Sequence, residues 1–187
     1  MEAISKTSKI DRIIKLTLLT IAGSILITIS AKIKIPFYPV PMTMQTFVIL
    51  LIGITLGYKI GLATVILYLL EGIVGLPVFS NSPEKGIGIT YFIGPTMGYL
   101  IGFLFAVYFS GSFKYEKGIV NTFLKLIFSV SFIYILGLIW LGILFGWYKP
   151  IFKIGAQPFL LAELLKILLL VFLTPILLKT KKLIKIT

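Results

Sequence analysis

The chain has 187 residues, of which 58% are hydrophobic and 13% charged, and its mean hydropathy is +1.09. Because so few polar residues could not cover a soluble globule of this size, we predict one integral membrane domain over residues 1–187. The formal net charge of +12 comes from lysines between the apolar runs and near both ends, a pattern that encodes orientation in a bilayer, so we expect a lipid bilayer as partner and no nucleic acid. Cys and His are absent from the sequence, which excludes disulfides, thiol nucleophiles, imidazole bases and the usual zinc or haem ligands.

The apolar stretches predict an all-α integral membrane protein. A helix needs about 20 predominantly apolar residues to cross the hydrocarbon core. Six such transmembrane helices are predicted, at residues 11–31, 44–58, 60–78, 91–110, 121–147 and 157–178. The second has a short apolar core, so it is either tilted or partly buried by its neighbours. The first is longer than a typical signal-peptide core, so we expect it to be a true span.

The distribution of Lys and Arg predicts the orientation. Of the 18 basic residues, Lys166 falls inside the sixth span. Five others lie in the loops of one side: Lys32, Lys34, Lys85, Lys149 and Lys153. The remaining twelve lie on the other side, together with both termini. Because the side richer in Lys and Arg is usually cytoplasmic, we predict that the N and C termini are cytoplasmic.

The three loops assigned to the outside are rich in proline. All but one of the nine prolines lie in or beside them: Pro36, Pro39, Pro41, Pro77, Pro83, Pro95, Pro150 and Pro158. Proline restrains the backbone, so the loops can form a shaped rim, although prolines also simply terminate helices. The unusual polar residues cluster on the same side, which favours a ligand site at the outer end.

Several candidate binding residues belong to this cluster. Gln45 lies at the outer mouth of the second span and Asn81 in the loop after the third, while Thr96 and Tyr99 open the fourth. Glu71, in the outer half of the third span, is either a further charge in the pocket or a carboxylic acid kept neutral by desolvation, and we favour a structural role for it. The aromatic residues that can line an apolar pocket, or serve as interfacial belt residues, are Tyr68, Phe79, Tyr91 and Tyr99.

Glu163 and Lys166 are the most informative pair, because a charge inside an apolar span is costly and usually faces a partner or a cavity. On a helix they lie one turn apart on nearly the same face. One interpretation is a mutually neutralising ion pair that fixes the helix to its neighbours. The other is a ligand site in which the carboxylate accepts N–H donors and the ammonium meets a carboxylate or carbonyl.

Four segments of the sequence are distinctive: residues 39–46 (PVPMTMQT), 67–79 (LYLLEGIVGLPVF), 94–103 (GPTMGYLIGF) and 158–166 (PFLLAELLK). In this order they resemble the signatures of the BioY family, the biotin-binding S components of energy-coupling factor (ECF) transporters. Two departures stand out. Glu163 occupies a position where the family usually has Asp, and the usually glycine-rich loop after Phe79 reads SNSPEKGIG over residues 80–88.

The resemblance implies a six-helix S component in the plasma membrane of a prokaryote, which takes up biotin with high affinity from outside. In this hypothesis Glu163 accepts from the ureido N–H groups of biotin, Gln45 or Asn81 completes the ureido hydrogen bonds, and Lys166 binds a carbonyl or the carboxylate. The orientation of biotin over the pair stays open. The wider set of predicted substrate-binding residues is Gln45, Phe79, Asn81, Tyr91, Tyr99, Glu163 and Lys166, with Tyr68, Glu71 and Thr96 as additional candidates.

The energy for uptake is expected to come from partner subunits. The sequence has no G-x-x-x-x-G-K-[ST] loop to hold ATP phosphates, so we expect this chain to bind no cofactor itself. Relatives dock on a transmembrane coupling subunit and two ATPases, largely through small residues of the first helix. Thr20, Ser24 and Thr28 form a small-residue stripe there that suits docking or, equally, packing within this chain.

Two other functions remain open at this stage. One is an S component for a different vitamin, which competition among vitamins would distinguish. The other is an intramembrane enzyme, for which carboxylates and a lysine are a limited set without His, Cys or a metal cluster. We therefore predict a carrier and not an enzyme.

Overall fold

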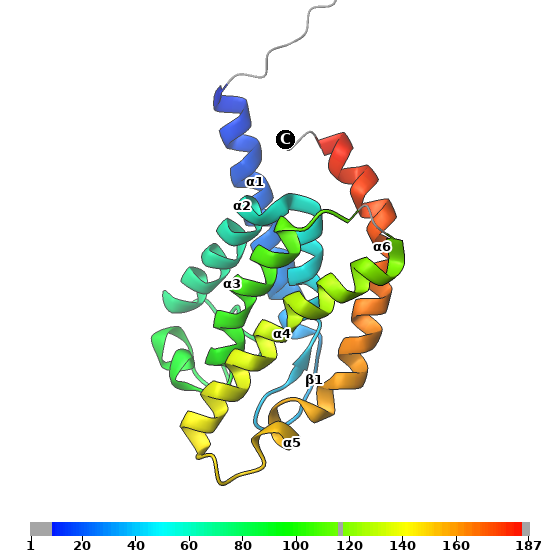
Figure 1. Ribbon diagram of the computed structural model, residues 1–187. Coiled ribbons are helices and arrows are strands. Elements are labelled where there is room, and N and C mark those ends of the chain that lie inside the picture. The colour runs from blue at the N-terminus through cyan, green and yellow to red at the C-terminus, as the bar shows by residue number, and fades with distance from the viewer. Residues whose placement is uncertain (1–8, 116–117, 185–187) are drawn as a thin grey trace, which may run out of the picture.

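The computed structural model describes residues 9–115 and 118–184, with side chains described up to residue 179. It is a bundle of helices with one very short two-stranded sheet (Figure 1). In chain order the elements are α1 (Lys9–Lys32), β1 (Lys34–Ile35), β2 (Met42–Thr43), α2 (Gln45–Ile73), the 3₁₀ helix η1 (Gly88–Ile93), α3 (Met97–Ser112), α4 (Gly118–Phe145), α5 (Ile151–Gly155), the 3₁₀ helix η2 (Gln157–Phe159) and α6 (Leu160–Ile184). The helical integral membrane fold that the sequence predicts is thus confirmed.

The element α2 consists of two helices joined at Gly57, where φ is 77° and ψ is 170°. An L side chain rarely adopts a positive φ, so glycine permits the break at this point. The chain reverses there, because a Cβ added to Gly61 would lie 3.7 Å from Ile52 Cγ2 (Figure 1). The two halves correspond to the second and third predicted spans, so the bundle has six helical passes.

The first half of α2 is short because it is enclosed by other helices. Ile49 and Leu50 are fully buried, and Ile52 and Ile54 are almost so. A helix surrounded by protein satisfies its backbone internally and need not match the thickness of the bilayer. Among the described residues, four helices are long and apolar enough to cross a membrane, namely Lys9–Lys32, Gln45–Ile73, Gly118–Phe145 and Ile151–Lys179, while Met97–Ser112 is a shorter apolar helix.

The helix ends around the 74–96 connection differ from the predicted span ends. The third span was expected to reach residue 78, but α2 ends at Ile73, followed by Gly75 with a φ of 100° and by Pro77. The fourth span was expected from residue 91, but that segment forms η1, and α3 begins only at Met97, after Pro95. Turn residues therefore shorten both helices and lengthen the connection between them to residues 74–96, which contributes to the site described below.

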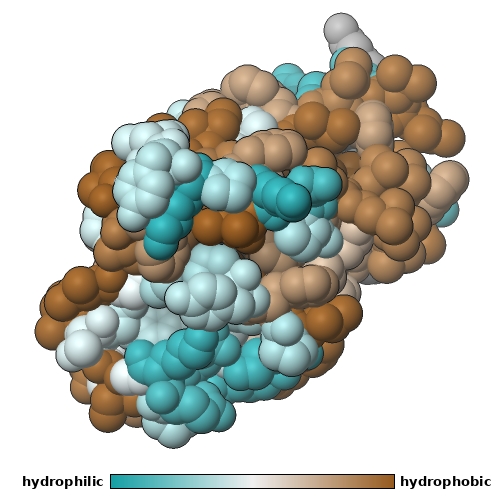
Figure 2. All heavy atoms as spheres, turned by 90° about the horizontal axis from the view of Figure 1, so that it is seen from below, coloured by the Kyte–Doolittle hydropathy of each residue, from teal (hydrophilic) through white to brown (hydrophobic). Residues whose placement is uncertain are grey.

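The passes place the start of α1 and the end of α6 at the same end of the bundle. In Figure 1 the start of α1 and the end of α6 lie at the top, whereas the β hairpin, the 74–96 connection and α5 lie at the bottom. The five lysines of the predicted outer loops are at this lower end, which we call the hairpin end. Seen from the hairpin end, hydrophilic side chains cross the face and hydrophobic ones cover the flanks (Figure 2). The arrangement fits the predicted membrane orientation, which itself stays a prediction.

The small residues of α1 pack within the chain. Gly23 and Ser24 are buried against α2, and the Ser24 hydroxyl donates a hydrogen bond to Glu71 Oε2. Thr20 and Thr28 are half-buried. Of the two roles considered for the stripe, Ser24 serves intrachain packing, because its side chain is not at the surface. Docking through Thr20 and Thr28 stays a prediction.

Candidate functional site

A cavity lies at the hairpin end of the bundle, and its volume is about 560 Å³ when the open space at its mouth is included. Its walls come from the hairpin, the first half of α2, the 74–96 connection, α3, α4 and α6. The lining residues are Val40, Pro41, Met42, Thr43, Gln45, Thr46, Phe79, Ser80, Tyr91, Thr96, Tyr99, Leu100, Phe103, Ile133, Tyr134, Phe159, Glu163 and Lys166.

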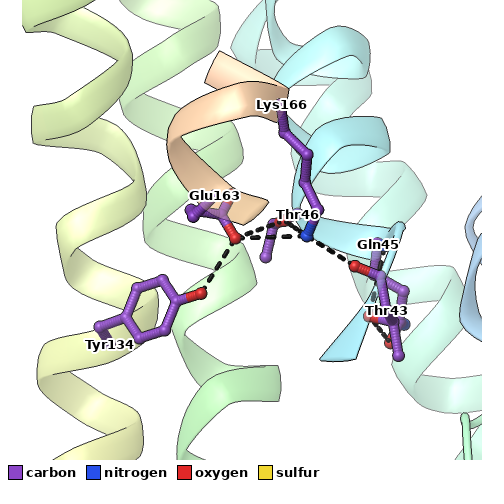
Figure 3. Close-up of polar contacts among 6 residues, drawn as sticks. All are labelled: Thr43, Gln45, Thr46, Tyr134, Glu163 and Lys166. Carbon is purple, nitrogen blue, oxygen red and sulfur yellow. Dashed lines mark hydrogen bonds and ion pairs between the residues drawn. The ribbon is translucent and has the colours of Figure 1, made fainter. Parts of the chain in front are cut away.

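Glu163 and Lys166 lie together in the cavity wall on the first turns of α6. Their side chains are 5% and 10% exposed, and Lys166 Nζ lies 3.4 Å from Glu163 Oε2. Glu163 Oε2 also accepts hydrogen bonds from Thr46 Oγ1 at 3.0 Å and Tyr134 OH at 2.9 Å (Figure 3). The other carboxylate oxygen, Oε1, is buried and has no hydrogen-bond partner among the residues that the structure describes. An unpaired buried carboxylate oxygen is costly, so a donor group that reached Oε1 would stabilise it.

Lys166 is held by protein groups on every side. Besides Glu163, its ammonium donates to Thr43 O at 2.7 Å and to Thr46 Oγ1 at 3.0 Å. An ammonium has three N–H donors, and all three have acceptors here. Lys166 therefore connects α6 to β2 and α2, and it has no donor left for a ligand unless one of these contacts is given up.

Aromatic rings form the opposite walls, and their hydroxyls bind backbone groups. Phe79 stacks on Tyr91 with ring centroids 4.6 Å apart, and Tyr68, which lies behind this wall, packs against Phe79 in a T-shaped arrangement with centroids 5.4 Å apart. Tyr99 OH donates to Gly155 O at 2.7 Å. Gly72 makes this packing possible, because a Cβ there would overlap the Phe79 ring. The rings thus present flat apolar faces in fixed positions, which suits a ligand with a rigid ring system.

The structure brings most of the predicted residues to this cavity. Those that line it are Gln45, Phe79, Tyr91, Thr96, Tyr99, Glu163 and Lys166. Asn81 lies in an adjoining hollow with Lys85, separated from the main cavity by Tyr91 and Thr96, which line both. Their contact with a ligand stays a prediction.

Tyr68 and Glu71 occupy other positions. Tyr68 is fully buried behind Gln45, whose Nε2 donates to the tyrosine hydroxyl at 2.8 Å. It supports the wall without being part of it. Glu71 does not line the cavity and points to Ser24 on α1, in line with the structural role that we favoured.

Sequence reasoning missed Tyr134 and Thr46, the two residues that hold Glu163 in place. Thr46 is part of the 39–46 segment, but only its neighbour Gln45 was singled out. Tyr134 carries a hydroxyl group within the long apolar run of α4, and this polar group in an apolar helix could have indicated the residue. Such a hydroxyl in a membrane helix usually finds a buried partner.

The fold and this cavity define a class: a multi-pass membrane protein with an aromatic-walled pocket at one end and a buried ion pair in the wall of that pocket. Within that class the family is clear. The model of the BioY family matches residues 4–183, and the chain belongs to this family.

Relatives of known description agree with the assignment. The chain is 36% identical over 143 residues to the biotin transporter BioY of Thermotoga maritima, covering 76% of this chain and 83% of that protein. It is 33% identical over 141 residues to a probable biotin transporter BioY of Pyrococcus horikoshii, covering 75% and 82%. The crystal structure of the S-component for biotin from an ECF-type ABC transporter superposes with a TM-score of 0.75 at 27% identity, covering 92% of this chain and 94% of that one.

These comparisons bear on the sequence predictions. They confirm the family and the plasma-membrane location in a prokaryote. The relatives are named as transporters, so the family supports the predicted carrier over an intramembrane enzyme.

Proposed function

We propose that this chain is the S component of an ECF transporter, that it binds biotin with high affinity in the cavity at the hairpin end, and that it takes up biotin from outside the cell. The observation that carries the proposal is Glu163 Oε1, an unpaired buried acceptor in an aromatic-walled cavity. The names of the relatives supply the ligand.

Biotin suits this arrangement chemically. Its fused bicycle is of low polarity and needs apolar walls, while its ureido group offers two N–H donors and one acceptor. Glu163 Oε1 accepts one ureido N–H, and the second lies in reach of Gln45 or the same carboxylate. Since the Lys166 donors are occupied, its part in binding is to fix the carboxylate and β2, and the valerate tail leaves toward the mouth of the cavity.

The test is a binding titration of the purified protein in detergent with biotin and with biotin methyl ester. We expect biotin to bind stoichiometrically and to be released unmodified. Nearly equal affinity for the ester would agree with a tail that projects to the mouth, whereas a large loss would place the carboxylate on a cation and overturn this orientation. Failure of biotin to bind at all, while another labelled vitamin binds, would support the S component of a different vitamin.

Delivery into the cell requires partners that supply energy. We propose a transmembrane coupling subunit and ATPase subunits, because the sequence contains no phosphate-binding loop and the related S-component belongs to an ECF-type ABC transporter. Co-expression with such a module should convert binding into ATP-dependent uptake, and uptake into vesicles measures it.

A further inference from the structure

The turn at residues 79–82 lies at the hairpin end and forms part of the cavity wall. Phe79 and Ser80 line the cavity. The turn is closed by Ser82, whose amide and hydroxyl both donate to Phe79 O. Tyr91 OH contacts Ser80 Oγ and the Asn81 amide, each at 3.3 Å. The Asn81 carbonyl accepts from the Lys85 amide. These contacts order the turn but give no donor to the carbonyl oxygens of Ser80 and Ser82.

Lys32, the last residue of α1, and Lys34, in β1, donate further hydrogen bonds to the turn, including those to Ser80 O and Ser82 O. Lys32 Nζ donates to Phe79 O and to Ser82 O, each at 2.8 Å. Lys34 Nζ donates to Ser80 O at 2.6 Å and to Asn81 Oδ1 at 3.2 Å. Every residue of the turn therefore gives an oxygen to one of the two ammonium groups. Hydrogen bonds from a charged donor are shorter and stronger than neutral ones.

The β hairpin that carries Lys34 also forms part of the cavity wall. Lys34 pairs with Thr43 in the β1–β2 ladder, and Thr43 lines the cavity and accepts from Lys166. Lys34 thus joins the hairpin, which forms one wall, to the turn that carries Phe79, which forms another, and Lys32 joins the end of α1 to the same turn. An isolated surface ion pair would contribute little. Here each ammonium bridges two acceptors and holds the backbone of a residue that faces the cavity.

We infer that Lys32 and Lys34 are positioning residues, which link the 79–82 turn to the end of α1 and to the β hairpin and thereby fix the Phe79 ring as a wall of the ligand cavity. The part of this inference that concerns the ligand rests on the proposed function. The link between the lysines and the turn does not rest on the proposed function, so an experiment can refute either one without refuting the other.

The experiment uses the full chain in detergent with Lys32→Met, Lys34→Met and Lys32→Arg, and with Lys153→Met as the control. Methionine keeps much of the aliphatic length and removes the donors, whereas arginine restores donors that can span two carbonyls. Lys153 is exposed on α5 and does not line the cavity. Two quantities are measured: hydrogen exchange of the peptide covering residues 78–86 without ligand, and the rate of biotin dissociation.

We expect each methionine variant to speed exchange in residues 78–86 while exchange in α4 stays as in the wild type, and to raise the biotin dissociation rate about fivefold. Lys32→Arg should restore both, and Lys153→Met should change neither. Unchanged hydrogen exchange of residues 78–86 in both methionine variants would refute the link between the lysines and the turn. Faster exchange with an unchanged dissociation rate would overturn the positioning of the ligand wall. If the methionine variants exchange faster but the wild type binds no biotin, the link between the lysines and the turn is supported and the proposed function is refuted.

Discussion

Replacing Glu163 by Gln tests the reasoning on the cavity most directly. The change keeps the shape of the side chain and removes its charge. The amide oxygen takes the place of Oε2, where Thr46, Tyr134 and Lys166 all offer donors. The NH₂ group then replaces Oε1 and points a donor at the place where a ligand N–H is expected.

The expected loss of biotin affinity follows from replacing this acceptor by a donor. A hydrogen bond to a charged group contributes about 1.5–3 kcal/mol, and a donor facing a donor leaves both unpaired. Since about 1.4 kcal/mol corresponds to a factor of ten, the Kd for biotin should rise about 10- to 100-fold. Folding should survive, because the three donors around Oε2 keep an acceptor.

Equilibrium titration of purified protein in detergent, with labelled biotin, measures this change. Glu71→Gln is the matched control, because Glu71 is a second carboxylate of the helical bundle that faces Ser24 and not the cavity. It should leave the Kd unchanged. An unaltered Kd in folded Glu163→Gln, or an equal loss in Glu71→Gln, would refute the assignment of Oε1 as the ligand acceptor.

Three further changes test the surroundings of the carboxylate and the aromatic wall. Tyr134→Phe removes one donor from Glu163 and should raise the biotin Kd about fivefold, as titration measures, whereas Tyr148→Phe on the exposed loop should not. Lys166→Ala strands a buried carboxylate and should both raise the Kd by about tenfold or more and lower the melting temperature in detergent. Gly72→Ala places a methyl group into the Phe79 ring and should destabilise the protein by about 1–3 kcal/mol, visible as a lower melting temperature.

Each of these has an outcome that contradicts it. Equal affinities for Tyr134→Phe and the wild type would mean that the hydroxyl does not hold the carboxylate. A Lys166→Ala protein with normal binding and melting would show that the ion pair is dispensable. Unchanged melting of Gly72→Ala would mean that Phe79 moves aside without cost.

The sequence allowed the passes and the cluster of loops at one end to be predicted, because hydropathy and basic residues report directly on the bilayer. It also indicated Glu163 and Lys166, since charges inside an apolar run are rare. Helix ends were harder to predict. In α2 and α3 the apolar pattern continues past Ile73 and begins before Met97, and turn residues rather than hydropathy decide where the helices stop.

The rotation of each helix could not be read from the sequence. Tyr68 and Glu71 lie three residues apart, yet one supports Gln45 and the other meets Ser24 on α1. A helix that is apolar all round has no polar face to show which side meets the cavity. For the same reason Tyr134 on α4 escaped notice, since its position relative to Glu163 depends on how α4 packs against α6.

The contacts around Lys166 have a consequence for how the protein is made. Lys166 reaches Thr43 across 123 positions of the chain, and Thr46 reaches Glu163 across 117. Until α6 is synthesised and inserted, the cavity lacks a wall and Thr46 lacks its carboxylate. Because contacts between distant segments form late in folding, the pocket is completed after the other passes are in place. Ligand binding during synthesis would therefore report the insertion of the final helix.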